Sequence, residues 1–313
     1  LAYVWTKDGQ VISGETGRTL VLSQVGLADA GVYGVTVSNG GGSIELSATV
    51  TVLPRVEFAE NAVENAVRNV LGIYGRVLTE VDLEGLTHLS IRELGVSSLQ
   101  GLEKAVNLFS LDFYGNQVSS LVPLSGLSGL GIVNLGNNPI SDFSPLNSMS
   151  GLRHIDADDM NLPDLSVFSG VTFLEHLSVR YNQISDLTPL RAFSNLRSLD
   201  IGGGNPISDF SVLGELTTLE SLSAWQIGLT DLSVLSPLQN LRVLNLAHNG
   251  ITDITALSGL PALTELILDW NSIQNIGVLE NLTHLRRVDV RDNEITDITV
   301  LGNSGLTDLT DVN

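Results

Sequence analysis

Leucine recurs at a nearly constant interval along most of this chain. It opens ten successive units of 22 residues, of which the sixth carries one extra residue. The units begin at Leu86, Leu108, Leu130, Leu152, Leu174, Leu196, Leu219, Leu241, Leu263 and Leu285. Within a unit, apolar residues occupy positions 1, 4, 6, 11, 14, 17 and 20. A period of this length, kept over ten units, indicates a solenoid built from one small stacking element.

The spacings within a unit predict two kinds of backbone. Positions 4 and 6 alternate as in a β-strand, whereas positions 11, 14, 17 and 20 step by three, as in a 3₁₀ or irregular return segment. A single unit cannot bury its own apolar face, so neighbouring units must stack and align their strands as a parallel sheet on the concave side.

Position 9 of the unit is polar. In seven units it is asparagine: Asn116, Asn138, Asn182, Asn205, Asn249, Asn271 and Asn293. An amide both donates and accepts hydrogen bonds. We therefore expect a buried column of asparagines that hydrogen-bonds the backbone N–H and C=O groups of the turns, which have no partner in the sheet. Leu94, Met160 and Ile227 interrupt the column.

The run Leu174–Leu190 (LEHLSVRYNQISDLTPL) resembles the leucine-rich repeat of the internalin family, and the resemblance extends from residue 86 to about 306. The helical pattern of Phe58–Leu83 resembles the N-terminal cap of internalin-like proteins. Its apolar positions are Ala59, Val63, Ala66, Val67, Val70 and Leu71. The resemblance implies a bacterial, non-enzymatic protein, secreted or at the cell surface, that adheres to or recognises a protein partner through its concave face.

Residues 1–53 follow a different pattern, with alternating strands and Gly/Asn turns. The motif Asp29-x-Gly31-x-Tyr33 resembles the tyrosine corner of an immunoglobulin-like domain, and Trp5 resembles its core tryptophan. Val35 stands where such domains carry their second cysteine. The first two strands are missing, so we expect a truncated all-β sandwich with an unpaired edge.

These patterns predict three regions: a partial immunoglobulin-like domain at 1–53, a linker and helical cap at 54–85, and a leucine-rich-repeat solenoid at 86–313. The chain begins at Leu1 without a basic and apolar leader, and no C-terminal cap is evident. We therefore expect it to be part of a longer protein.

Charge and composition exclude several classes of function. Lys and Arg number 15 against 35 Asp and Glu, a formal charge of −20, which argues against binding nucleic acid. The absence of cysteine excludes thiolate nucleophiles and Cys-ligated metal centres. The longest charge-free run, 113–141, is broken by Asn, Pro and Gly, so no membrane insertion is expected.

Part of the acidic surplus has an architectural explanation. Aspartate occupies position 13 in seven units: Asp142, Asp164, Asp186, Asp209, Asp231, Asp253 and Asp297. A short acceptor just before a return segment can cap its free N–H groups. The net charge is therefore weak evidence for a basic ligand.

Side chains at positions 2, 3, 5, 7 and 8 should point off the concave sheet and do no packing in the core. Exposed aromatic and arginine side chains on a rigid surface are typical of interface hot spots. The candidate partner-binding residues are Tyr114, Arg180, Tyr181, Trp225, His248, Asp269, Trp270 and Arg291. The competing interpretation is that these are ordinary solvated strand residues. Position 5 forms a polar row for which several roles are open: recognition of a basic partner or of sugar hydroxyls, low-affinity Ca²⁺ binding, or solubility alone.

His154 and His176 share position 3 of adjacent units, close enough in principle to share a metal ion, with Asp156 beside them. Two nitrogens are half of a zinc site, and nothing in the sequence clearly completes it, so no metal and no cofactor is predicted. No catalytic constellation can be assigned from spacing, which makes an enzyme the least favoured class. The prediction is a monomeric binding protein for a protein partner or, in its place, a glycan. A spacer or stalk without a specific ligand and an intracellular scaffold are the competing hypotheses.

Overall fold

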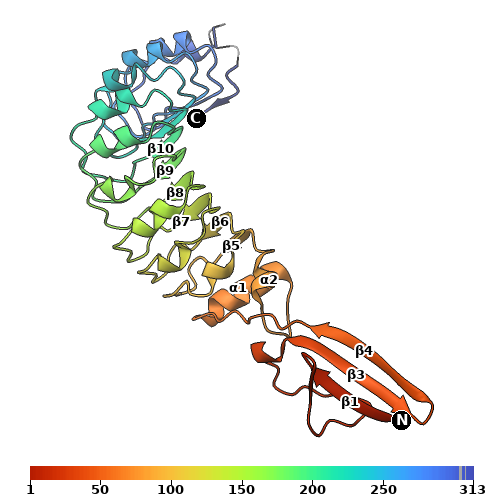
Figure 1. Cartoon of the computed structure of the whole chain (residues 1–313). Coiled ribbons are helices and arrows are strands. Elements are labelled where there is room, and N and C mark those ends of the chain that lie inside the picture. The colour runs from red at the N-terminus through yellow and green to blue at the C-terminus, as the bar shows by residue number, and fades with distance from the viewer. Residues whose placement is uncertain (303–304, 307) are drawn as a thin grey trace. The chain divides into compact units, whose positions relative to one another are not determined.

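A computed structural model describes residues 1–302, 305, 306 and 308–313. The chain forms two compact units (Figure 1). One comprises Leu1–Val56 with Gly75–Leu83, and the other comprises Glu57–Tyr74 with Glu84–Asn313.

The first unit contains one four-stranded antiparallel sheet of order β2-β1-β3-β4. Its elements are β1 (Ala2–Lys7), β2 (Gln10–Val11), the 3₁₀ turn η1 (Leu27–Asp29), β3 (Gly31–Asn39), β4 (Gly42–Val50) and the short helix α2 (Glu80–Leu83). Nearly all of β4 is exposed. A single sheet has no second layer to bury its face, as expected for a sandwich that lacks strands.

Two aromatic residues anchor this sheet. Tyr33 is buried, and its hydroxyl donates to the carbonyl oxygen of Asp29 at 2.9 Å, a contact typical of a tyrosine corner. Trp5 pairs with Val35 across β1 and β3, is half-buried, and donates from Nε1 to the carbonyl of Gly17 at 2.9 Å. The indole is therefore tied to a loop.

The second unit begins with helix α1 (Asn61–Leu71), which lies against β5. Val63 and Val67, one turn apart, are fully buried, and Gly72 ends the helix in the left-handed conformation at φ +67°. The predicted apolar stripe was too wide in two places. Ala59 precedes the helix, and Val70 is 54% exposed in its last turn, although its spacing places it on the same face as Val63 and Val67.

Strands β5 to β15 form one eleven-stranded parallel sheet in sequence order. The strands are β5 (His88–Ser90), β6 (Ser110–Asp112), β7 (Ile132–Asn134), β8 (His154–Asp156), β9 (His176–Ser178), β10 (Ser198–Asp200), β11 (Ser221–Ser223), β12 (Val243–Asn245), β13 (Glu265–Ile267), β14 (Arg287–Asp289) and β15 (Asp311–Val312). Strands β5 to β14 hold positions 3–5 of the ten repeats. The repeat-like tail adds β15, which pairs with β14.

Each repeat returns through a 3₁₀ helix, as its three-residue steps predicted. These helices are η2 (Leu102–Lys104), η3 (Val122–Leu124), η4 (Ser144–Ser148), η5 (Ser166–Phe168), η6 (Thr188–Ala192), η7 (Ser211–Glu215), η8 (Leu232–Leu235), η9 (Thr255–Gly259), η10 (Gly277–Asn281) and η11 (Thr299–Gly302). All seven position-13 aspartates accept a hydrogen bond from the backbone N–H two residues on, at 2.7–2.9 Å. The acidic column is confirmed as a set of turn caps.

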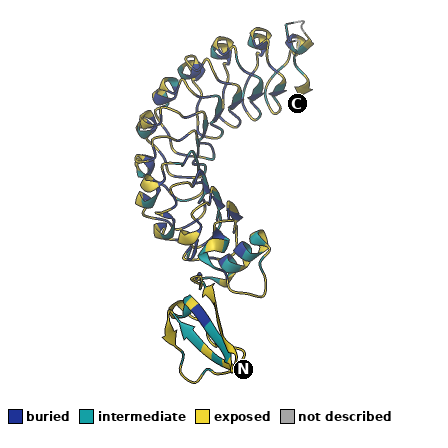
Figure 2. Cartoon of the chain, turned by 45° about the vertical axis from the view of Figure 1, so that its right-hand side comes forward, coloured by how far each residue is buried: buried dark blue, intermediate teal, exposed yellow. Residues whose placement is uncertain are grey.

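The core runs between the sheet and the return segments (Figure 2). In the eighth repeat every predicted apolar position is at most 1% exposed: Leu241, Leu244, Leu246, Ile251, Ile254, Leu257 and Leu260. The period of 22 therefore corresponds to one turn of a leucine-filled coil.

The asparagine column forms the predicted hydrogen-bond ladder. Asn249 Nδ2 donates to the carbonyls of Ala224, Leu246 and Ala247, and its Oδ1 accepts from the backbone of the preceding repeat, including Gly228 at 2.9 Å. Each asparagine thus joins its own repeat to the one before it. The joined groups are turn backbone groups that the sheet leaves unpaired.

The ladder breaks where Met160 and Ile227 replace asparagine. At these two places the preceding repeat closes on itself: Ile140 N–H bonds the carbonyl of Asn138 at 2.9 Å, and Ile207 N–H bonds that of Asn205 at 2.8 Å. The donors stay satisfied, but no position-9 amide links repeat 3 to repeat 4 or repeat 6 to repeat 7.

Among the residues that the structure describes, no helix has the length and apolar character needed to cross a bilayer.

Candidate functional site

The concave face is defined as the side chains at positions 2, 3, 5, 7 and 8 of the repeats. Because paired strands are in register, each position forms a row across the sheet. The position-5 row runs through Ser90, Asp112, Asn134, Asp156, Ser178, Asp200, Ser223, Asn245, Ile267 and Asp289. The polar row predicted along the middle of the concave face is confirmed.

Position 8 has a backbone property that its spacing did not reveal. In all ten repeats this residue adopts a left-handed conformation, with φ between +49° and +77°. The ten residues are Glu93, Gly115, Asn137, Asp159, Tyr181, Gly203, Gln226, His248, Trp270 and Asp292. Glycine, asparagine and aspartate tolerate this region, whereas bulky side chains are costly there. Tyr181 and Trp270 are therefore held in place at a cost to stability.

The tyrosine and tryptophan side chains of the concave face each contact another ring or a guanidinium group. Tyr181 meets Trp225 edge to face with ring centroids 5.4 Å apart. His248 stacks on Trp270 at 5.2 Å. Tyr114 lies beneath the guanidinium of Arg92, 4.6 Å from its ring centroid. Tyr181 and Trp270 remain 51% and 56% exposed, so these packed rings still offer apolar surface.

The glycine run of the sixth repeat makes room for the aromatic pair. A Cβ at Gly202 would lie 2.2 Å from Nε1 of Trp225, and one at Gly203 would lie 2.8 Å from the Tyr181 ring. In the sequence this run is visible only as an irregularity of the repeat. Its steric role becomes apparent only in the folded coil, where Tyr181 of the fifth repeat and Trp225 of the seventh repeat pack against these glycines.

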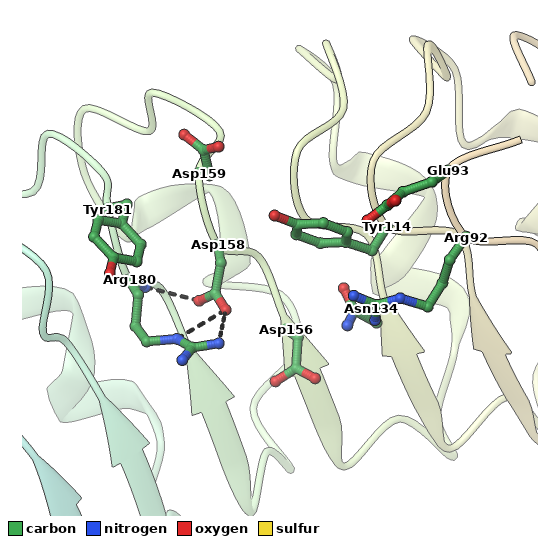
Figure 3. A pocket seen from close by; sticks show the side chains of 9 residues that line it. All are labelled: Arg92, Glu93, Tyr114, Asn134, Asp156, Asp158, Asp159, Arg180 and Tyr181. Atoms are coloured by element: carbon green, nitrogen blue, oxygen red, sulfur yellow. Dashed lines mark hydrogen bonds and ion pairs between the residues drawn. The ribbon is translucent and has the colours of Figure 1, made fainter. Parts of the chain in front are cut away.

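A hollow of about 610 Å³ opens on the concave face of the first five repeats (Figure 3). Its lining residues, which define the concave hollow, are Arg92, Glu93, Tyr114, Asn134, Asp156, Asp158, Asp159, Arg180 and Tyr181. Four carboxylates and two guanidinium groups leave the lining net negative.

A buried carboxylate fixes one wall of the concave hollow. Asp158 accepts from Nε and Nη2 of Arg180 at 3.0 and 2.6 Å, and from the Ser178 hydroxyl at 2.7 Å. The bonded Asp158 raises the pKa of Arg180 above its ordinary value. Burial raises the pKa of neighbouring Asp200. Arg180 is thereby held rigidly while 43% of its side chain stays exposed.

The structure divides the predicted binding residues into two groups. Tyr114, Arg180 and Tyr181 line the concave hollow. Trp225, His248, Asp269, Trp270 and Arg291 lie further along the sheet, outside it. Arg291 bonds Asp289 at 2.5 Å in its own repeat.

Six residues of the hollow were not among the predicted binding residues. Columns 5, 7 and 8 already contained all of them: Arg92, Glu93, Asn134, Asp156, Asp158 and Asp159. Their repeat positions could therefore have identified them, but mainly aromatic and basic residues at these positions were selected as candidates.

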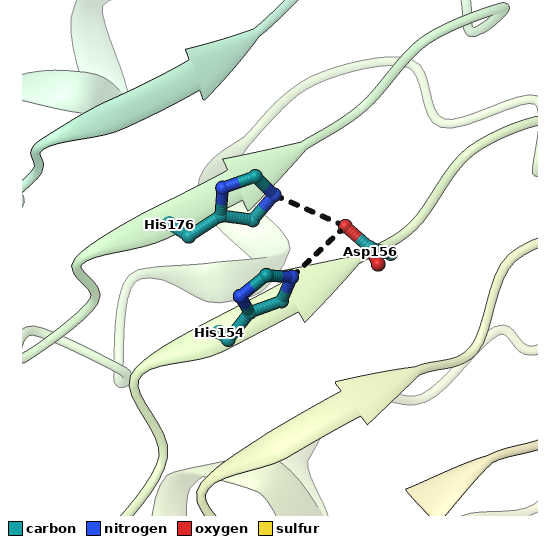
Figure 4. A group of neighbouring side chains, drawn as sticks. All are labelled: His154, Asp156 and His176. Carbon is teal, nitrogen blue, oxygen red and sulfur yellow. Dashed lines mark hydrogen bonds and ion pairs between the residues drawn. The ribbon is translucent and has the colours of Figure 1, made fainter. Parts of the chain in front are cut away.

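His154, Asp156 and His176 form a second cluster on this face (Figure 4). Nε2 of His154 lies 3.4 Å and Nε2 of His176 lies 3.2 Å from Oδ1 of Asp156. The imidazole rings stack with centroids 3.8 Å apart. Burial raises the pKa of Asp156, but the contacts with the two histidines outweigh burial and hold it well below the ordinary value.

Family models of the leucine-rich repeat match residues 106–170 and 172–215, described as "Leucine Rich repeats (2 copies)", residues 215–273, "Leucine rich repeat", and residues 281–298, "Leucine Rich repeat". Together the matches cover more than half of the chain. The chain is a leucine-rich-repeat protein. No curated protein matches the sequence of this leucine-rich-repeat protein.

Solved structures similar to the leucine-rich-repeat protein include internalins of Listeria monocytogenes. Internalin inlF is 26% identical over 84% of this chain and 98% of its own, with a TM-score of 0.52. Internalin C2 is 25% identical over 85% and 99%, with a TM-score of 0.53. The functional domain of InlJ, which includes a cysteine ladder, is 23% identical over 83% and 57%, with a TM-score of 0.64, and shows the shared fold.

Proposed function

We propose that this leucine-rich-repeat protein is a non-enzymatic recognition or adhesion protein that binds a protein partner through its concave face, outside the cell or at its surface. Leucine-rich-repeat folds typically bind proteins and typically do not catalyse reactions. The internalin-like neighbours support the surface location.

The observation that carries this proposal is the pair of bulky aromatic residues held left-handed and exposed, Tyr181 and Trp270. A left-handed bulky residue costs about 1–2 kcal/mol, and glycine occupies the same position in two other repeats at no such cost. Backbone strain of this kind concentrates at functional positions. Rigid, exposed aromatic rings bury large area at low entropic cost when a partner docks.

The chemistry of the face favours a partner with basic side chains beside an apolar ridge. Glu93, Asp156 and Asp159 would attract cations at the concave hollow, while the Tyr181–Trp225 pair would pack against the ridge. A spacer without a ligand predicts aromatic residues scattered singly. The paired rings favour recognition over a spacer role.

The N-terminal regions complete the proposal. We infer that residues 1–53 are the second half of an immunoglobulin-like domain, a proposal supported by the Tyr33 to Asp29 hydrogen bond. We retain 54–85 as linker and cap and 86–313 as the repeat domain, acting as a monomer.

Capture from cell-surface extracts tests the function. The immobilised chain is compared with a Trp225→Ala/Trp270→Ala double variant and with Tyr74→Ala, which removes a 66% exposed tyrosine that follows α1. A protein retained by wild type and Tyr74→Ala but lost by the double variant supports the proposal. Equal retention by all three chains contradicts it, and binding confined to a glycan array would replace the protein partner with a sugar.

A further inference from the structure

The sheet register places two histidines and one aspartate where they can act together. His154 of β8 and His176 of β9 are direct strand partners, and Asp156 lies two residues beyond His154 on the same strand. Alternate residues of a strand share a face, and neighbouring strands lie about 4.8 Å apart. The three side chains therefore leave the concave face side by side.

Their donor atoms have the separations of metal ligands. Both imidazoles turn Nε2 toward Oδ1 of Asp156, at 3.4 and 3.2 Å (Figure 4). Ligands bound to zinc at about 2.1 Å in a tetrahedral arrangement lie roughly 3.4 Å apart. All three donor atoms lie within 4.8 Å of one another, and this is the one such cluster found within the described part of the chain.

We propose that His154, Asp156 and His176 form a binding site for a divalent transition-metal ion such as Zn²⁺. Two imidazoles and one carboxylate suit zinc, copper, nickel or iron rather than Mg²⁺ or Ca²⁺, which prefer oxygen ligands. With three protein ligands, at least one coordination position is left for water. The site goes beyond the proposed recognition function and does not depend on it.

Loading the site requires the histidine stack to open. The rings now lie 17° from parallel, so their lone pairs run side by side instead of converging. Their side chains are 34% and 27% exposed, which leaves room for each ring to rotate. The hydrogen bond to Asp156 favours a proton on Nε2, and metal binding there moves this proton to Nδ1.

The surrounding charges favour a cation. Two guanidinium groups lie near the cluster, and both are paired. Arg180 is shared between Asp158 at 2.6 Å and Asp200 at 3.7 Å, and Arg153 lies 3.8 Å from Glu175. Three carboxylates therefore exceed two guanidinium groups by one negative charge before Asp156 is counted. With neutral histidines, the charge of Asp156 is left for the ion.

Calorimetric titration of the full chain with Zn²⁺ tests the proposal, after removal of any polyhistidine tag. Wild type should bind one ion in a saturable step. His154→Gln, His176→Gln and Asp156→Asn should each lose about 10-fold or more in affinity, since even indirect ligand changes cost about 10–100-fold. His88→Gln is the matched control, because His88 occupies the same repeat position on β5 without a histidine beside it in the row.

Imidazole ¹⁵N NMR of the wild type gives a readout that does not depend on variant folding. Zn²⁺ should shift the resonances of two of the five histidines, and chelation should remove those shifts. The proposal is overturned if wild type shows no saturable zinc binding, if His88→Gln weakens it as much as His176→Gln, or if other histidines shift instead. Equal or stronger binding of Ca²⁺ would also overturn it.

Discussion

His248 and Trp270 stack with ring planes 8° apart, although both residues hold the left-handed backbone, at φ +58° and +57°. The two residues occupy the same position of adjacent repeats, so their side chains are aligned in the same way as the paired strands. The contact recovers part of the conformational cost, since stacked aromatic pairs contribute about 0.5–1.5 kcal/mol. The rest of that cost is met by the surrounding coil.

Removing either tryptophan should weaken partner binding. Trp225→Ala and Trp270→Ala are each expected to lose about 2 kcal/mol or more of binding free energy, because both rings offer apolar area on the concave face. The melting temperature should change little. Biolayer interferometry against the captured partner measures the loss, and unchanged affinity in both variants would rule out the aromatic surface as the docking site.

The left-handed backbone at position 8 predicts that a glycine variant is more stable there than an alanine variant, the reverse of the usual order. Trp270→Gly should be more stable than Trp270→Ala by about 1 kcal/mol, because both lose the same ring but alanine keeps the cost of positive φ. Urea unfolding measures the difference. The backbone of Trp225 is not left-handed, so Trp225→Gly should be less stable than Trp225→Ala. If the alanine variant were the more stable one at residue 270 as well, the proposed backbone strain at Trp270 would be contradicted.

Gly202 supplies a way to move Trp225 without deleting it. A methyl group at residue 202 would enter the space of the indole, so Gly202→Ala should displace the ring and separate it from Tyr181. We expect a shift in tryptophan fluorescence and weaker partner binding with an intact fold. Gly204→Ala tests backbone effects alone, because no atom lies within 4 Å of its added Cβ; an identical spectral change there would refute the steric account.

Loss of a ladder amide should be costly. Asn249→Ala removes a buried side chain that bonds turn groups of two repeats, and we expect about 3 kcal/mol lower stability because several buried groups lose their partner. Asn195→Ala, at an exposed position, should change stability by less than about 0.5 kcal/mol. Similar unfolding midpoints for the two variants would show that the ladder contributes little.

The turn caps predict how stability depends on acid. Backbone N–H donors hold the pKa values of Asp186, Asp209 and Asp253 below the ordinary value of 3.8. A depressed folded pKa stabilises the protein above the unfolded pKa, and this contribution is lost as pH falls through the folded values, here below about pH 4. Asparagine can cap without titrating. The triple Asp→Asn variant at these positions should therefore lose less melting temperature on acidification than wild type.

The control for charge is a second triple variant, Asp159→Asn/Asp269→Asn/Asp292→Asn. It removes three carboxylates from the concave face and none from a turn cap. Its acid sensitivity should stay close to that of wild type. An equal gain in acid resistance would attribute the effect to net charge rather than to capping.

The repeat fold could be predicted because one unit explains most of the chain. Leu244 is buried for the same reason as the leucine at position 4 of the neighbouring repeats, so period alone gives strand, return segment and core. Asn249 and the aspartate caps followed from the same columns. The ladder breaks at Met160 and Ile227 were readable as well, but the local bonds that satisfy Ile140 and Ile207 were not.

The candidate site was harder to predict because it depends on contacts between columns. Tyr181 reaches Trp225 over Gly203 and Gly202, a relation that needs the extra residue of the sixth repeat to be placed in space. Asp156 belongs to a polar row, and the distance from its carboxylate to two imidazoles is set by rotamers that spacing does not define. The repeat spacing defines the columns, and packing selects which of their members meet.

The two missing ladder amides divide the column into blocks of three, three and four repeats, with seams after the third and sixth repeats. Amide hydrogen exchange should begin at these seams, since there no position-9 amide bridges the turn backbone of the two repeats. The concave hollow spans the first seam, and the Tyr181–Trp225 contact spans the second. A ligand that contacts both the concave hollow and the Tyr181–Trp225 pair would join the blocks on either side of each seam. It would therefore slow hydrogen exchange at residues that it does not contact.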